Sequence, residues 1–333
     1  MRFRTLGTTD LEVSEVGFGV WTVATNWWGK ITEEAGIGLL QKAYDLEINL
    51  FDTADSYGDG YGEEIVAKAL GRKRQEIVLC TKLGYDFYDN VLGEGHEERP
   101  QNFDPEFIRY ACEQSLRRLG TDYIDLYQLH NPRIDTIERD EVFETLDELI
   151  TEGKIRYYGV VLGPDIGWFE EGEASMKERH VHALQIVYSI LEQDPANHIF
   201  PIAEEEKTGL VTRVPHASGI LDGTYTKDLV FDADDHRSKR RQQWLEESVQ
   251  KMTPLDFLTG GLKSTMAQIA IKFALSGPRV TSVLPDITNQ PQLEEFAAAP
   301  HTEDIPDEFL DRITDLYEEN FYVESVAEAS ETG

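Results

Sequence analysis

Short β-rich apolar runs and amphipathic stretches alternate along nearly the whole chain of 333 residues. The runs that predict strands are VSEVGFGVW, EINLFDTA, EIVLCTKL, YIDLYQLH, IRYYGVVL, VHALQIVYSI, TGLVTRVP and RVTSVLP. Eight strands that alternate with helices predict an α/β fold, a (β/α)8 TIM barrel, with an open doubly wound sheet as the alternative. We predict one barrel domain over residues 1–320 and an acidic C-terminal tail over residues 321–333.

Signals for helix ends lie between these runs. Thr32 is a predicted N-cap for the helix after the first strand. Asp104 is the predicted N-cap of a later helix, with Pro105 at its first position and Gly120 as its stop. Gly277 ends the stretch KSTMAQIAIKFALSG in the same way.

Two long segments interrupt the alternation, one after the third predicted strand and one after the seventh. They cover residues 85–103 and 219–261, and the second contains RSKRRQQWLEESVQKM, a predicted extra helix. Loops of this length in a compact domain usually serve function. Because both segments follow strands, they should lie at the carboxyl-terminal face of the barrel, where active sites of this fold are built.

The chain is strongly acidic, with 31 Lys and Arg against 63 Asp and Glu and a formal net charge of −32. The acids are spread over segments such as ERDEVFETLDEL and IPDEFLDRITDLYEEN, and such a surface argues against nucleic-acid binding. Self-repulsion weakens a compact state at low salt, whereas at about 1 M salt the Debye length falls to about 3 Å. We therefore expect a halophilic protein that depends on molar salt.

The compartment is predicted from the cysteines and the N-terminus. Cys80 and Cys112 lie in apolar segments without metal-type spacing, so both are expected to be buried structural thiols in a reducing environment. The N-terminus lacks an apolar leader, and no apolar run approaches the ~20 residues that span a bilayer. These features favour a cytoplasmic protein without membrane contact.

Four polar side chains fall at or just past the ends of three consecutive predicted strands: Asp52, Tyr57, Lys82 and His130. Strand ends of a barrel meet at one rim, so a carboxylate, a phenol, an ammonium and an imidazole should meet there. A tyrosine with a pKa of ~10 is a poor acid at neutral pH, but a nearby ammonium favours its phenolate. We therefore predict an acid–base site in which Asp52 holds the charged lysine in place.

The two-residue period of a strand also predicts which side chains face the barrel interior. If Lys82 faces inward, so do Cys80 and Val78, while Thr81 and Leu79 face the helices.

The segment DTADSYG, the lysine of the third strand and the segment LYQLHNP together resemble the signature of the aldo-keto reductase family. TMAQIAIKFALSGPRVTSVLPDITNQPQLEEF resembles the last helix, last strand and cofactor-phosphate segment of that family. The resemblance implies reduction of a carbonyl by NADPH or NADH, or the reverse oxidation of an alcohol. It makes Tyr57 the general acid, with its pKa lowered by Lys82 and Asp52, and has His130 donate to the carbonyl oxygen.

The same resemblance implies a cofactor site with departures from the family pattern. Its residues would be Gln185, Arg213, Ser218, Gly219, Thr288, Asn289, Gln292 and Glu295. Asn289 stands where a cation commonly pairs with the 2′-phosphate, and Asp286 adds a like charge. We therefore expect NADP(H) ahead of NAD(H), with weakened discrimination between them.

Two departures concern the nicotinamide itself. Val161 and Leu162 occupy the places of a Ser-Asn pair that holds the carboxamide, which leaves Gln185 as the matching ligand. Arg213 replaces an aromatic residue that stacks on the ring. Its guanidinium could stack, reach the pyrophosphate or form an ordinary ion pair.

The substrate pocket is expected to collect aromatic side chains from the loops. Trp21 lies at a family position that lines the pocket, and Trp27, Trp28 and Tyr85 are further candidates. Such walls suit an aliphatic, aromatic or sugar-derived carbonyl or alcohol substrate. No grouping has metal-ligand spacing, so no metal is predicted, and the protein is expected to be a monomer or weak homo-oligomer.

Two other functions remain open from the sequence. One is a non-catalytic subunit of the same fold that senses nicotinamide nucleotides. The other is an unrelated barrel enzyme, a sugar isomerase or a deazaflavin-dependent oxidoreductase.

Overall fold

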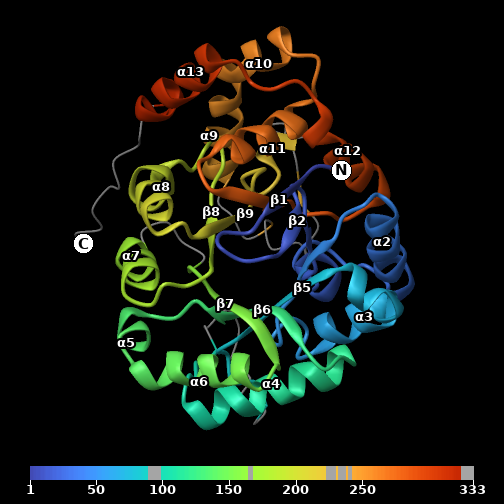
Figure 1. Ribbon diagram of the computed structural model, residues 1–333. Helices are drawn as coiled ribbons and strands as arrows, with labels where there is room; N and C mark the ends of the chain where they lie inside the picture. Colours follow the sequence, from blue (N-terminus) through green and yellow to red (C-terminus); the bar gives the residue numbers. More distant parts are fainter. Residues whose placement is uncertain (89–98, 164–167, 223–229, 232–237, 239–241, 324–333) are drawn as a thin grey trace, which may run out of the picture.

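A computed structural model of the protein describes residues 1–88, 99–163, 168–222, 230, 231, 238 and 242–323. One parallel sheet of eight strands follows the chain order from β3 to β10, and helices surround it (Figure 1). The predicted (β/α)8 barrel is confirmed. Its strands are β3 (Phe18–Gly19), β4 (Leu50–Asp52), β5 (Val78–Leu83), β6 (Ile124–His130), β7 (Ile155–Val161), β8 (Ala183–Val187), β9 (Gly209–Arg213) and β10 (Val280–Leu284).

Backbone contacts bring the two edges of this sheet together. The amide of Gly17 donates to the carbonyl of Val283 at 2.9 Å, and the amide of Val283 donates to that of Glu15, also at 2.9 Å. The barrel therefore closes just before β3, which keeps the carboxyl ends of first and last strands at the same rim.

The prediction that VSEVGFGVW forms a single barrel strand is wrong. Its start belongs to β2 (Glu12–Ser14), which pairs antiparallel with β1 (Phe3–Thr5), and only β3 enters the barrel. This hairpin inserts Leu6, Leu11 and Val13 into the apolar cluster inside the barrel. A hairpin strand followed by a barrel strand buries alternate apolar residues, just as one long strand would. The apolar pattern of VSEVGFGVW therefore could not show that two strands, β2 and β3, are present.

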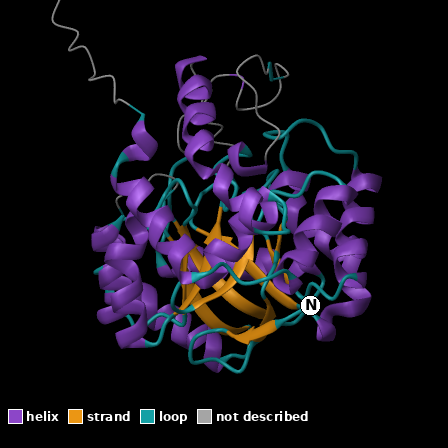
Figure 2. Cartoon of the chain, turned by 90° about the horizontal axis from the view of Figure 1, so that it is seen from above, coloured by secondary structure: helices purple, strands orange, loops and turns teal. Residues whose placement is uncertain are grey.

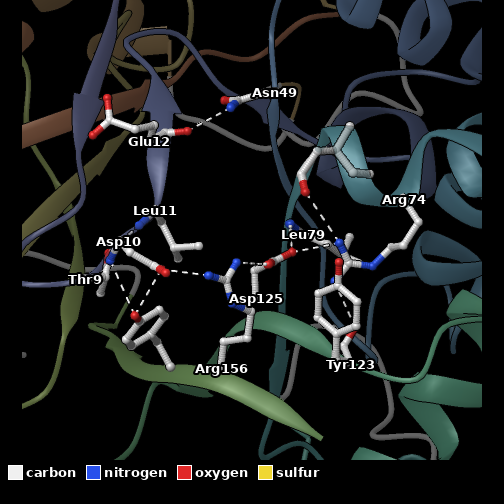
Figure 3. A network of polar contacts seen from close by, with 12 residues as sticks. Thr9, Asp10, Leu11, Glu12, Asn49, Arg74, Leu79, Tyr123, Asp125 and Arg156 are labelled. Atoms are coloured by element: carbon white, nitrogen blue, oxygen red, sulfur yellow. Dashed lines mark hydrogen bonds and ion pairs between the residues drawn. The ribbon is translucent and has the colours of Figure 1, made fainter. Parts of the chain in front are cut away.

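Ion pairs tie the hairpin to the amino-terminal end of the barrel (Figure 3). Asp10 accepts from the Arg156 guanidinium at 2.6 Å, and Arg156 also donates to Asp125 at 2.9 Å. The buried Asp125 carboxylate is further paired with Arg74 at 2.8 Å and accepts the Leu79 amide at 2.9 Å. These contacts lie at the amino-terminal face of the barrel, opposite the carboxyl-terminal ends of the strands. Contacts at that face contribute to stability.

The helices pack around the strands, as the view in Figure 2 shows. They are α1 (Trp21–Ala24), α2 (Glu33–Asp45), α3 (Tyr61–Leu70), α4 (Pro105–Leu119), α5 (Ile134–Ile137), α6 (Asp140–Thr151), α7 (Phe169–Lys177), α8 (Asp194–Glu206), α9 (Gln242–Met252), α10 (Asp256–Gly261), α11 (Met266–Ser276), α12 (Gln290–Ala298) and α13 (Asp307–Glu318). No helix within the described part of the chain is long and apolar enough to cross a membrane.

Most predicted helix ends are confirmed. The Thr32 hydroxyl accepts the amide of Ala35 at the start of α2, and Gly120 ends α4 with a positive φ of 63°. Gly277 is the C-cap residue of α11. Asp104 stands at the N-cap position of α4 but makes no side-chain cap, because its carboxylate accepts from Arg139 at 2.8 Å instead.

The inward and outward faces of β5 follow the predicted alternation. Val78 and Cys80 belong to the apolar cluster inside the barrel, whereas Leu79 belongs to the cluster between strands and helices. The Thr81 hydroxyl donates outward to the buried Glu63 carboxylate at 2.6 Å. Lys82 must therefore point into the barrel, toward its carboxyl-terminal rim.

The long segment after the seventh barrel strand contains helices. The predicted extra helix is present as α9, and α10 follows it, while residues 223–229, 232–237 and 239–241 lie outside the described residues. The segment after β5 is described up to Tyr88 and again from Arg99. Phe321, the first residue of the predicted tail, is 2% exposed, and residues 324–333 lie outside the described residues.

Candidate active site

The four predicted acid–base residues meet at the carboxyl-terminal rim. Asp52 ends β4, Lys82 lies one residue before the end of β5, and His130 ends β6. The Lys82 ammonium donates to Asp52 Oδ1 at 2.5 Å and to the carbonyl of Thr53 at 2.6 Å. It lies 4.8 Å from the ring centroid of Tyr57, and that ring lies 5.9 Å from the His130 ring. The expected juxtaposition is thus observed.

Two amides complete the surroundings of Asp52. Gln128 and Gln185 donate their Nε2 groups to Asp52 Oδ2 at 3.0 and 3.1 Å. With Lys82 on the other oxygen, the carboxylate accepts from three side chains. Gln128 is not among the residues predicted from the sequence, although the two-residue period from His130 on β6 places it inside the barrel.

Lys82 is completely buried, yet its charge is compensated. Burial lowers the pKa of Lys82, but the neighbouring Asp52 and Tyr57 raise it by more, so the pKa lies above its ordinary value. The lysine is therefore an ammonium at neutral pH, as expected from its pairing with Asp52.

The pKa of Tyr57 differs from the expectation. Burial raises it, the charge of Lys82 lowers it, and the charge of Asp52 raises it, so the pKa lies above 10.0. The sequence predicted a lowered value because the neighbouring cation is visible in a motif, whereas the extent of burial is not. Tyr57 is consequently a protonated phenol at neutral pH, as a proton donor must be.

His130 is the neutral member of the group. Burial and the charges of Lys82 and Arg213 lower its pKa well below 6.5. Its Nδ1 has no hydrogen-bond partner within the described residues. A neutral imidazole carries one N–H donor, so His130 can donate to an oxygen held beside Tyr57 without bringing a second proton.

Aromatic rings form a continuous wall beside Tyr57. The Trp21 ring lies 5.1 Å from the Tyr57 ring and 5.2 Å from that of Trp27, and Trp28 is partly buried in the same loop. The Tyr85 ring lies 4.9 Å from the His130 ring. Three of the four predicted substrate-site residues therefore adjoin the acid–base group directly or through one ring.

The other aromatic residues after β5, Phe87 and Tyr88, pack against α4. Phe87 stacks on Tyr88 with centroids 4.2 Å apart, and the Tyr88 hydroxyl accepts from Arg118 of α4 at 3.1 Å. Tyr88 also contacts the rings of Phe107 and Tyr110. These side chains pack the loop onto α4, and Tyr85 alone of the group turns to the site.

The predicted phosphate segment forms a compact turn at the start of α12. Asn289 is its N-cap and accepts the Gln292 amide at 3.0 Å, while the Gln292 side chain accepts both the amide and the hydroxyl of Thr288. Glu295 lies further along and accepts from Thr265 at 2.6 Å. The turn therefore brings three of the four predicted residues together, and Glu295 is engaged by the capping residue of α11.

The turn after β9 places the other two predicted phosphate residues. Ser218 and Gly219 both have positive φ, 60° and 92°. His216 is buried in the same turn, lies 4.5 Å from the Phe296 ring and contacts the carbonyl of Ala267 at 3.1 Å. Burial lowers the pKa of His216 to about 4, so it is a neutral packing residue.

The end of β7 is apolar, and Arg213 reaches over it. Val161 is buried at the end of the strand, and Leu162 packs in the cluster between strands and helices. The Arg213 guanidinium donates through Nη2 to the carbonyls of Leu162 and Gly163, each at 3.0 Å. Its Nε is buried with no hydrogen-bond partner within the described residues. This orphaned donor and Gln185 fit a polar group such as the nicotinamide carboxamide.

No group of three or more His, Cys, Asp and Glu side chains within the described ranges is arranged to hold a metal ion. Both cysteines are free and buried.

Fold and site together define a TIM-barrel protein in which Asp52, Tyr57, Lys82 and His130 cluster at the carboxyl-terminal rim. The family model described as "Aldo/keto reductase family" matches residues 15–318. An uncharacterized oxidoreductase of Bacillus subtilis, YqkF, is 31% identical over 97% of this chain and 98% of its own. The chain belongs to the aldo/keto reductase family.

Solved structures agree with this assignment. An aldo-keto reductase from Bacillus halodurans, in its holo form, has a TM-score of 0.77 and 31% identity, and the match covers 95% of this chain and 96% of that one. A glycerol dehydrogenase from Gluconobacter oxydans has a TM-score of 0.81 and 26% identity over 97% of each chain.

Proposed function

We propose that the protein is an NAD(P)(H)-dependent oxidoreductase that reduces an aldehyde or ketone to an alcohol, or catalyses the reverse reaction. The observation that carries the proposal is the buried Lys82, which pairs with Asp52 and lies against Tyr57 beside a neutral His130. An ammonium, a phenol and an imidazole around one point are suited to protonate and stabilise a developing alkoxide.

A nicotinamide cofactor held at the rim would supply the hydride for reduction of the carbonyl carbon and would take it up in oxidation. Tyr57 gives its phenolic proton to the carbonyl oxygen, and the resulting phenolate is stabilised by the ammonium of Lys82. His130 donates a hydrogen bond to the same oxygen and orients the carbonyl. A pKa of Tyr57 above 10.0 is compatible with this role, because an alkoxide is a far stronger base than a phenolate.

The cofactor would be held at the rim by Gln185 and Arg213 and along the turns at Ser218 and at 288–292. We place NADP(H) ahead of NAD(H) on the basis of the family resemblance. Asn289 caps α12 and brings no cation to this turn, so the discrimination should be weak. A hydrogen bond from a cation to the 2′-phosphate would favour NADP(H) over NAD(H) by about 1.5–3 kcal/mol, and Asn289 does not provide it.

The test is a titration of intrinsic tryptophan fluorescence with NADPH and NADH, followed by turnover with a panel of small aldehydes. Trp21 lies 5.1 Å from Tyr57, so it should report a nicotinamide bound at the rim. We expect saturable quenching by both nucleotides. Quenching without turnover would favour the non-catalytic nucleotide-sensing role, and the absence of quenching by either nucleotide would rule the proposal out.

We further propose a salt-adapted protein of the cytoplasm. The net charge of −32 repels itself at low ionic strength, and the free buried thiols suit a reducing compartment. The midpoint of thermal unfolding should rise steeply with KCl up to about 1 M, where screening is nearly complete. Sucrose, which favours burial without screening charge, should not replace KCl. An unfolding midpoint independent of salt would contradict this proposal.

A further inference from the structure

We propose that Arg213 donates its Nε–H to the carboxamide oxygen of the bound nicotinamide, in place of the side chains that Val161 and Leu162 cannot provide. This inference rests on the proposed function, because it assigns a contact within the nicotinamide site. It makes Arg213 the residue that fixes the orientation of the carboxamide in this chain.

A nicotinamide carboxamide at the end of β7 needs a hydrogen-bond donor that this strand end does not supply by its side chains. A carboxamide that enters a buried site must have its oxygen and its N–H groups paired, because an unmade hydrogen bond there weakens binding. Val161 offers only a buried aliphatic side chain at the end of β7, and Leu162 packs among the helices. Gln185 already donates its Nε2 to Asp52 at 3.1 Å, which leaves its Oε1 to accept from the carboxamide N–H. The carboxamide oxygen then needs another donor.

Arg213 lies beside the strand end where this donor is needed. Gln185 of β8 stands opposite Val161 of β7, and Arg213 of β9 stands opposite Val187, two residues beyond Gln185 on the same face of β8. The Nη2 group of Arg213 is fixed by the carbonyls of Leu162 and Gly163, each at 3.0 Å. The guanidinium therefore covers the very strand end that lacks polar side chains.

The Nε–H group of Arg213 can supply this donor. The Nε of Arg213 is buried and has no hydrogen-bond partner within the described residues. A guanidinium anchored by one nitrogen offers another in a fixed direction, which a flexible ammonium does not.

The test compares three ligands on wild-type protein and on Arg213→Met by calorimetric titration in molar KCl. NADPH carries the whole carboxamide, its reduced 3-acetylpyridine analogue keeps the oxygen but lacks the amide nitrogen, and 2′-phospho-ADP-ribose lacks the ring. We expect the substitution to weaken NADPH and the analogue by about 10- to 100-fold and 2′-phospho-ADP-ribose by no more than about threefold.

Two further variants separate the contact from general damage. Arg213→Lys keeps a donor for the carbonyls of Leu162 and Gly163, and it should still lose most of the affinity for NADPH. Arg133 is exposed and stacks on Trp168 in a neighbouring loop, so Arg133→Met should leave all three affinities unchanged.

Each other outcome overturns the assignment. Equal weakening of all three ligands would place Arg213 on the pyrophosphate or in a purely structural role. Loss for NADPH without loss for the acetylpyridine analogue would show that the oxygen is not the contacted atom, and unchanged affinities would show no contact. If no nucleotide binds the wild-type protein, the proposed function is overturned as well. If the wild-type protein binds NADPH but the variants do not behave as expected, only the assignment of Arg213 fails.

Discussion

Replacement of Tyr57 by phenylalanine is expected to lower the turnover of carbonyl reduction by about 10²- to 10⁴-fold, the usual contribution of a positioned general acid. The change removes one hydroxyl and keeps the ring that contacts Trp21 and His130 at 5.1 and 5.9 Å. Because the hydroxyl acts on the substrate oxygen, the affinity for NADPH should change by less than about threefold. Single-turnover kinetics measure the rate of carbonyl reduction, and the fluorescence titration measures the affinity for NADPH.

Tyr85→Phe is the matched control for this variant. The Tyr85 ring also adjoins His130, at 4.9 Å, but its hydroxyl accepts from Asn131 at 2.7 Å. Removal of that hydroxyl should lower turnover by less than about tenfold, since it takes away a hydrogen bond of about 0.5–1.5 kcal/mol and no proton donor. Equal losses in the two variants, or a Tyr57→Phe variant with full turnover, would show that Tyr57 is not the acid.

The alternation of β5 and β6 explains why the acid–base group could be predicted from the sequence. Once Lys82 is placed inside the barrel, the period of two fixes Cys80 and Val78 inside as well, and the cluster inside the barrel contains both. The ends of neighbouring parallel strands must then meet at one rim. Gln128 obeys the same rule, but a lone glutamine carries no motif, so its contact with Asp52 became visible only in three dimensions.

The features that escaped prediction depend on distant parts of the chain. The N-terminal hairpin is fixed by Asp10 and Arg156, which lie 146 positions apart. The pKa of Tyr57 is raised because the effect of burial outweighs that of the charge of Lys82, and the extent of burial is set by the folded structure. The anchoring of Arg213 on the end of β7 depends on backbone carbonyls, and these carry no sequence signal.

Lys82→Met is expected to reduce both stability and activity, because it leaves a buried charge without its partner. Lys82 is fully buried, and Asp52 is 5% exposed. Removal of one member of a buried ion pair typically costs 3–5 kcal/mol, roughly the range we expect for the free energy of unfolding. Denaturant unfolding at constant KCl measures this loss, and turnover should fall at least as far as in Tyr57→Phe, since the phenolate loses its neighbouring cation.

The double variant Lys82→Met with Asp52→Asn separates the charge from the cavity. Asparagine keeps an oxygen that can accept from Gln128 and Gln185, whose donors lie 3.0 and 3.1 Å from Asp52. With neither member of the former ion pair charged, the double variant should recover about half or more of the lost stability, because a neutral pair replaces an uncompensated ion. Turnover should stay as low as in Lys82→Met. A double variant no more stable than the single one would mean that lost packing, and not the unpaired carboxylate, accounts for the loss. Recovery of stability together with turnover would show that the ammonium serves the fold alone and that the acid is tuned by another group.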